Sequence, residues 1–185
     1  MSGFIDHRNY PALAPLVAGM IERWPELLRE AIGAIDRFVP SPEIHIQDAD
    51  DIRLFILPIK WRGEMADQIE QLCGGDQILE AVPVAASLAS NPLVPSALFS
   101  MSMPGCELIP HVDNESHIGE VLRLHIGLSC PADCALIVGD EARTWHDGEV
   151  LMFDSARVVH SAYNRSNQPR LVLILDVDRK ALEAP

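Results

Sequence analysis

The stretch that decides the fold runs from Val121 to Leu128 and reads Val-Leu-Arg-Leu-His-Ile-Gly-Leu. Successive side chains of a β-strand point to opposite faces of a sheet. The alternation therefore predicts a strand with Leu122 and Leu124 on one face and Arg123 and His125 on the other. The polar face either lines the interior of a barrel, where it would attract anions, or it faces solvent.

Similar short runs continue through the second half of the chain, separated by Gly, Pro, Asn and Asp. Eight such strands, spaced roughly ten residues apart, are typical of a β-sandwich or barrel. The last one is apolar from Leu171 to Leu175, so we expect both of its faces to be covered. The predicted strands are 98–103, 107–112, 121–128, 135–138, 143–145, 150–153, 158–163 and 171–177.

The first half mixes helix and strand. Helical spacing predicts helices at 11–20 and 26–36, and Pro25 suits the first position of the second one. Residues 65–73 also predict a helix, 78–90 fit a helix better than a strand, and 43–47 and 53–59 resemble strands. The expected fold class is mainly β with flanking α: a double-stranded β-helix (a cupin-like jelly roll) braced by N-terminal helices. We expect one domain over 1–185, with 1–95 supplying helical support and outer strands and 96–180 forming the catalytic core.

The composition limits the classes of partner. The formal net charge is −13, and an acidic surface of this size argues against nucleic acid or an anionic membrane, which both select basic patches. No apolar run reaches the roughly 18 residues that a membrane span needs. The first residues do not resemble a signal peptide, so we expect a cytoplasmic protein with reduced cysteines. The spacing of Cys130 and Cys134 does not favour a zinc site.

The segment His111-Val112-Asp113 places an imidazole and a carboxylate on the same face of one strand. Alone, this pattern is weak and could be a turn or a surface pair. His160 follows four or five short strands later, about the distance needed to return beside the first strand. Two histidines and one carboxylate leave three metal positions open, as in non-haem iron(II) oxygenases. A 2-oxo acid and dioxygen can occupy those positions.

Arg170 opens the apolar strand at 171–177, ten residues after His160. A guanidinium inside an apolar barrel is unfavourable unless an anion pairs with it. Its two-pronged donor set matches a carboxylate. Arg170 therefore binds either the distal carboxylate of 2-oxoglutarate or a structural carboxylate of the protein.

With these residues in order, the region 98–178 resembles the aspartyl/asparaginyl β-hydroxylase family. The resemblance implies a double-stranded β-helix, Fe(II) and 2-oxoglutarate as co-substrate. It implies that His111 and His160 bind the iron, that Arg170 binds the distal carboxylate, and that Ser100, Arg123 and His125 contact the co-substrate. The motifs that carry it are 103–111, 122–128, Trp145-His-Asp-Gly148, Phe153-Asp154, His160 and 170–176.

One departure concerns Asp113. The animal peptidyl hydroxylases of this family have glycine there, whereas bacterial relatives that hydroxylate free amino acids, of the cis-4-proline hydroxylase type, keep the His-x-Asp pair. The expected function is therefore hydroxylation of an unactivated C–H bond of an amino acid or amino-acid-derived small molecule, with release of succinate and carbon dioxide. Alternatives are a peptide or carrier-tethered substrate, or a non-catalytic cupin that binds a metal or ligand. Candidate substrate contacts are Asn114, His117, Trp145 and Arg157.

Overall fold

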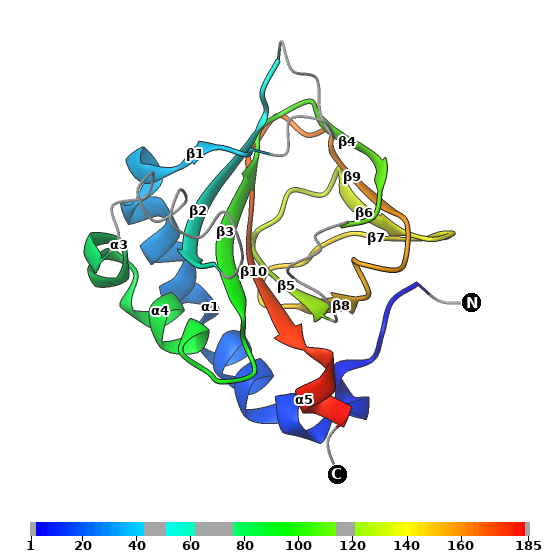
Figure 1. Ribbon diagram of the computed structural model, residues 1–185. Helices are drawn as coiled ribbons and strands as arrows, with labels where there is room; N and C mark the ends of the chain where they lie inside the picture. Colours follow the sequence, from blue (N-terminus) through cyan, green and yellow to red (C-terminus); the bar gives the residue numbers. More distant parts are fainter. Residues whose placement is uncertain (1–2, 43–50, 62–75, 114–120, 184–185) are drawn as a thin grey trace.

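The computed structural model describes residues 3–42, 51–61, 76–113 and 121–183. Two antiparallel sheets form its centre (Figure 1). The larger sheet has the order β1-β2-β3-β10-β5-β8, and the smaller has the order β4-β9-β6-β7. The strands are β1 (Val39–Pro40), β2 (Leu54–Lys60), β3 (Ser96–Ser102), β4 (Cys106–His111), β5 (Val121–Ser129), β6 (Cys134–Val138), β7 (Glu141–Arg143), β8 (Val150–Phe153), β9 (His160–Asn164) and β10 (Arg170–Asp178).

Helices cover the outer face of the larger sheet (Figure 1). The α-helices are α1 (Ala14–Gly33), α3 (Asp76–Ala81), α4 (Pro83–Ala89) and α5 (Arg179–Glu183), and the 3-10 turns are η1 (His7–Asn9), η2 (Pro11–Leu13) and η3 (Ile35–Arg37). Within the described ranges, none of these helices has the length and apolarity that a membrane span needs.

The period-two pattern of the strands separates two apolar clusters. On β10, Leu171, Leu173 and Leu175 pack with the helices, whereas Val172 and Ile174 pack between the two sheets. All five side chains are buried, so the expectation that this strand is covered on both faces is confirmed. The double-stranded β-helix with bracing helices is likewise confirmed, and the division at residue 95 stays a prediction.

The prediction of two helices around Pro25 was wrong, because α1 continues through that residue. Proline inside a helix removes one hydrogen bond and costs about 3 kcal/mol. Met20 and Leu27, on either side of Pro25, are both fully buried. Each such side chain contributes about 1.5–3 kcal/mol, so packing of the continuous helix outweighs the loss. The helix predicted at 78–90 is confirmed, but it is divided before Pro83 into α3 and α4.

Seven of the eight strands predicted between residues 98 and 177 are present, most with shifted ends. The strand expected at 143–145 was misplaced: β7 ends at Arg143, and Trp145 lies in the loop that follows it. β9 begins at His160 and not at Val158, because the amide of Val158 bonds to the carbonyl of Asp154 in a turn. The strand predicted at 53–59 is β2. The elements predicted at 43–47 and 65–73 lie outside the described residues.

Candidate metal and co-substrate site

A bulge in β4 brings the two candidate histidines together. Leu108 pairs with Ala162, and His111 pairs with His160. Between these two pairs β4 therefore contains one more residue than β9. The extra residue falls beside Pro110, which has no N–H to give to a ladder. Without the bulge Pro110 would stand opposite His160. The bulge thus sets the two imidazoles beside each other, with ring centroids 4.3 Å apart and ring planes tilted by 53°.

Asp113 lies two residues beyond His111, where its amide donates to the carbonyl of Ser155 at 2.9 Å. Its Oδ1 lies 3.7 Å from Nε2 of His111 and 3.6 Å from Nε2 of His160. One ligand atom from each of the three residues falls within 4.8 Å of the others. The structure therefore brings the predicted triad to one point.

The two histidines present the same nitrogen to that point. Nδ1 of His111 lies 2.6 Å from the carbonyl oxygen of Ile109, and Nδ1 of His160 lies 3.1 Å from that of Val158. A carbonyl oxygen can only accept, so each Nδ1 carries the hydrogen. In a neutral imidazole of this tautomer Nε2 turns its lone pair towards the centre, the form in which imidazole binds metals.

The protonation states suit a cation. Burial lowers the pKa of His160 to about 4, although the carboxylate of Asp113 opposes the shift. Burial raises the pKa of Asp113, but the positive charge of Arg123 outweighs it, assisted by His160 where that ring is protonated, and holds the pKa below its usual value. His160 is thus neutral and Asp113 ionised at neutral pH. Two lone pairs and a carboxylate oxygen turned towards one another fit a divalent metal of the iron type.

Arg123 lies directly behind Asp113. Its Nη1 donates to Oδ2 of Asp113 at 2.5 Å, and its Nε and Nη2 donate to the two oxygens of Asp176 at 2.7 and 3.0 Å. The polar face of β5 therefore points to the interior. The co-substrate contact that the family resemblance assigns to Arg123 stays a prediction, since these nitrogens face carboxylates of the protein. The sequence analysis did not predict a role for Asp176, which follows the apolar run 171–175 inside β10.

Arg170 is a buried cation, 3% exposed. Within the described ranges no carboxylate pairs with it, and its Nε has no hydrogen-bond partner. Its guanidinium lies over the ring of Trp145, 4.2 Å from the ring centroid. The described residues therefore offer no carboxylate for a structural salt bridge with Arg170.

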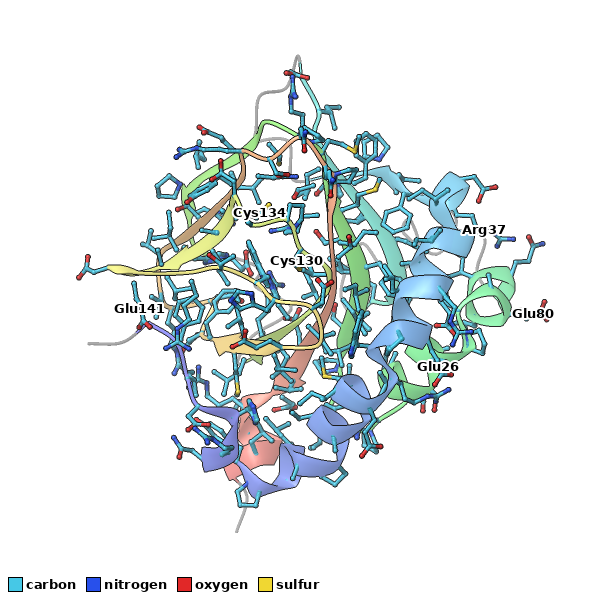
Figure 2. All side chains as sticks on the ribbon, turned by 180° about the vertical axis from the view of Figure 1, so that it is seen from behind. Glu26, Arg37, Glu80, Cys130, Cys134 and Glu141 are labelled. Carbon is cyan, nitrogen blue, oxygen red and sulfur yellow. The ribbon has the colours of Figure 1, made fainter. Side chains whose placement is uncertain are left out.

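The ionisable groups that act on Arg170 are thiols. Cys106, Cys130 and Cys134 are free, and Figure 2 labels the last two near the interior between the sheets. Burial raises the pKa of all three, that of Cys130 to about 12. Neutral thiols do not supply an anion, so Arg170 is suited to a carboxylate that arrives with a ligand.

His125 offers a second donor. The indole N–H of Trp145 donates to its Nδ1 at 3.3 Å, so the ring hydrogen sits on Nε2. That Nε2 is buried and has no partner among the described residues. Burial, assisted by the charges of Arg123 and Arg170, holds the pKa of His125 well below its usual range. The interior therefore contains a neutral N–H donor and a guanidinium that both lack an acceptor.

Two serines of β3 lie on the same interior face. Ser100 is buried and stands opposite Val172. Ser102 stands opposite Arg170, and its hydroxyl has no partner within the described ranges. The co-substrate contact predicted for Ser100 stays a prediction. Ser102 was not predicted, although its spacing of two from Ser100 is a usable signal.

The predicted substrate residues fall in different places. Trp145 is 1% exposed and lies beneath Arg170, so it contacts a ligand only from inside the fold. Arg157 is exposed, in the turn that leads to His160. Asn114 and His117 lie outside the described residues. Their substrate contacts stay predictions.

A double-stranded β-helix with a two-histidine, one-carboxylate cluster defines the class to which 2-oxoglutarate- and iron(II)-dependent hydroxylases belong. A family model described as aspartyl/asparaginyl β-hydroxylase matches residues 22–180. The chain belongs to this family, and the resemblance predicted from the sequence is confirmed.

Relatives and solved structures agree with this assignment. The aspartyl/asparaginyl β-hydroxylase of Homo sapiens is 26% identical over 171 residues, covering 88% of this chain and 21% of that protein. Aspartate β-hydroxylase domain-containing protein 1 of Bos taurus is 34% identical over 87 residues, 44% of this chain and 22% of that protein. The chain thus spans about a fifth of these relatives' length. A prolyl-4-hydroxylase of Pseudomonas putida shares the fold at 19% identity and a TM-score of 0.51, with 88% of each chain covered.

Proposed function

We propose that the chain is an Fe(II)- and 2-oxoglutarate-dependent dioxygenase that hydroxylates an amino acid or an amino-acid-derived small molecule. The observation that carries the proposal is the convergence of His111, Asp113 and His160 within 4.8 Å. Both imidazoles turn a lone pair inward and the carboxylate is ionised. This donor set would hold iron through three ligands and leave three positions for co-substrate and dioxygen.

The interior also suits 2-oxoglutarate. Arg170 would bind the distal carboxylate, because it is a buried guanidinium without an anion in the described part of the chain. The N–H of His125, likewise without an acceptor, would donate to a co-substrate oxygen. Bound iron and 2-oxoglutarate supply the oxidation of a C–H bond, with release of succinate and carbon dioxide. The residues of the chain bind, orient and exclude water.

The substrate class rests on Asp113. The resemblance associates an intact His-x-Asp pair with bacterial members that act on free amino acids. The alternative is a peptide or carrier-tethered substrate, which the family description favours because it names aspartyl and asparaginyl hydroxylation. A non-catalytic cupin is disfavoured by Arg170, since a protein that binds only a metal does not need a buried guanidinium.

A succinate-release assay tests the proposal. Purified protein with Fe(II), 2-oxoglutarate and ascorbate is screened against free amino acids, N-acylated amino acids, short Asp- or Asn-containing peptides and carrier-bound amino acids. We expect succinate in stoichiometric amount with a product 16 Da heavier for a free or acylated amino acid, and none from Asp113→Ala. Turnover of peptides alone would support the alternative, and iron binding without any turnover would support the non-catalytic cupin.

A further inference from the structure

The two oxygens of Asp113 face different partners. Oδ1 lies 3.7 Å and 3.6 Å from the Nε2 atoms of His111 and His160, on the side where a metal would bind. Oδ2 accepts from Nη1 of Arg123 at 2.5 Å. The side chain of Asp113 is 7% exposed, so little water competes for either oxygen. One oxygen is thus available to a metal and the other is held by the protein.

Arg123 is itself held from behind. Asp176 accepts from Nε at 2.7 Å and from Nη2 at 3.0 Å, the two-pronged arrangement that fixes the plane of a guanidinium. The two residues are direct partners across β5 and β10, and the side chain of Asp176 is 1% exposed. Both strands lie inside the larger sheet. Nη1 is therefore presented to Asp113 from a rigid frame.

This geometry has a consequence for the number of open metal positions. A carboxylate can bind a metal through one oxygen or through both. Binding through both would leave only two positions of an octahedral ion, whereas a bidentate 2-oxo acid and dioxygen need three. A charged donor on Oδ2 keeps that oxygen from turning to the metal, in the way that outer partners orient metal ligands generally.

We propose that the Arg123–Asp176 pair is a positioning device that restricts Asp113 to binding the metal through Oδ1 alone. The proposal rests on the metal site of the proposed function. It assigns Arg123 a place behind the metal ligand, where the resemblance expects it to contact the co-substrate. This role of the Arg123–Asp176 pair is possible only in family members that have a carboxylate at the position of Asp113. A glycine there offers Arg123 no oxygen.

The test uses the full chain loaded with Mn(II), and the readout is the number of water molecules on the metal, measured by water-proton relaxation. We expect about three waters in the wild type, one for each open position of the two-histidine, one-carboxylate site. In Arg123→Met/Asp176→Asn we expect about two, because the released Oδ2 also binds the metal. With 2-oxoglutarate bound through two positions, about one water should remain on the metal of the wild type and none on that of the double variant.

Two further variants make the result decisive. Arg179→Met removes the guanidinium from a second buried ion pair, with Asp154, and so controls for loss of a buried charge. It should keep the wild-type water count and 2-oxoglutarate affinity. Asp176→Asn alone keeps the side-chain volumes and the guanidinium of Arg123, and it should lower the average water count less than the double variant does.

The outcomes separate the two proposals. Wild-type protein that binds no Mn(II) at the triad would overturn the proposed function and this inference together. A metal-loaded double variant with the wild-type water counts, without and with 2-oxoglutarate, would overturn the inference and leave the metal site standing. An unchanged water count with weaker 2-oxoglutarate binding would show that Arg123 contacts the co-substrate, and would also overturn it.

Discussion

Arg170, which we propose binds 2-oxoglutarate, is a buried cation, and burial of its charge is energetically unfavourable. Desolvation lowers its pKa, and within the described ranges it has no carboxylate partner. Buried charges are often less favourable than apolar side chains of similar volume. We therefore predict that Arg170→Met raises the free energy of unfolding of the ligand-free protein, by about 1–2 kcal/mol, and abolishes binding of 2-oxoglutarate.

Thermal unfolding with Mn(II), with and without 2-oxoglutarate, measures both effects. The co-substrate should raise the Tm of the wild type and leave that of the variant unchanged. A variant less stable than the wild type in the absence of ligand would mean that Arg170 has a structural anion after all.

Trp145 acts on two residues that face the interior. It stacks under Arg170 and fixes the tautomer of His125 through its indole N–H. Trp145→Phe keeps a ring and removes the donor. We predict roughly fivefold weaker binding of 2-oxoglutarate, because one hydrogen bond contributes about 1 kcal/mol. Tyr10→Phe, which removes a hydroxyl from a partly buried aromatic side chain packed against the helical cluster, is the control. Equal affinities of both variants and the wild type would contradict this role of the indole.

At the scale of single residues, the sequence predicted His111, Asp113 and His160 as one cluster, and the structure brings them together. The spacing of two between His111 and Asp113 predicted that pair from strand geometry, but β4 ends at His111, and Asp113 is held by the bond from its amide to the carbonyl of Ser155. Asp176 was not predictable in the same way. Its pairing with Arg123 depends on the register of β5 against β10, which links residues 53 positions apart.

Among the elements, β5 and the loop that follows β7 depend on a close backbone approach. The amide of Gly148 donates to the carbonyl of Gly127 at 2.9 Å, and a Cβ on Gly127 would overlap the carbonyl oxygen of His146. This contact holds the loop that delivers Trp145. The motifs 122–128 and Trp145-His-Asp-Gly148, which are separate in the sequence, are thus in direct contact in the structure.

We predict that Gly127→Ala lowers the free energy of unfolding by about 1–3 kcal/mol, as overpacking does, and weakens 2-oxoglutarate binding. Gly33→Ala is the matched control, since a Cβ there meets nothing within 4 Å and alanine favours helix. It should be neutral or stabilising. Urea unfolding compares the two, and a Gly127→Ala protein as stable as the control would contradict the tight junction.

The helix boundaries could not be predicted from the sequence pattern alone. Pro25 predicted a helix boundary from local propensity, yet α1 continues because its buried stripe runs through that position. The strands were predicted more completely, since each short apolar run is bounded by turn residues. Their ends shifted where a loop hydrogen bond, such as that of Val158, replaced a ladder bond.

For the whole molecule, the buried neutral His125 predicts acid sensitivity. Its folded pKa lies well below the usual 6.5, so the unfolded chain binds the proton more readily. Stability is therefore full above about pH 6.5 and falls as the pH drops below it. His125→Gln should flatten the dependence of the urea midpoint on pH between about 6.5 and 5. The comparison uses slopes, because the substitution also changes stability at every pH. An unchanged slope would mean that His125 does not contribute.

We infer that this acidic chain assembles one iron and 2-oxoglutarate site from strands of two sheets. Anaerobic titration with Fe(II) and 2-oxoglutarate tests it most directly, through the weak visible charge-transfer band of the chelate. We predict a band that saturates at one equivalent of each, and its loss in His160→Ala and in Arg170→Met. Absence of the band in folded wild-type protein at saturating Fe(II) and 2-oxoglutarate would contradict the account.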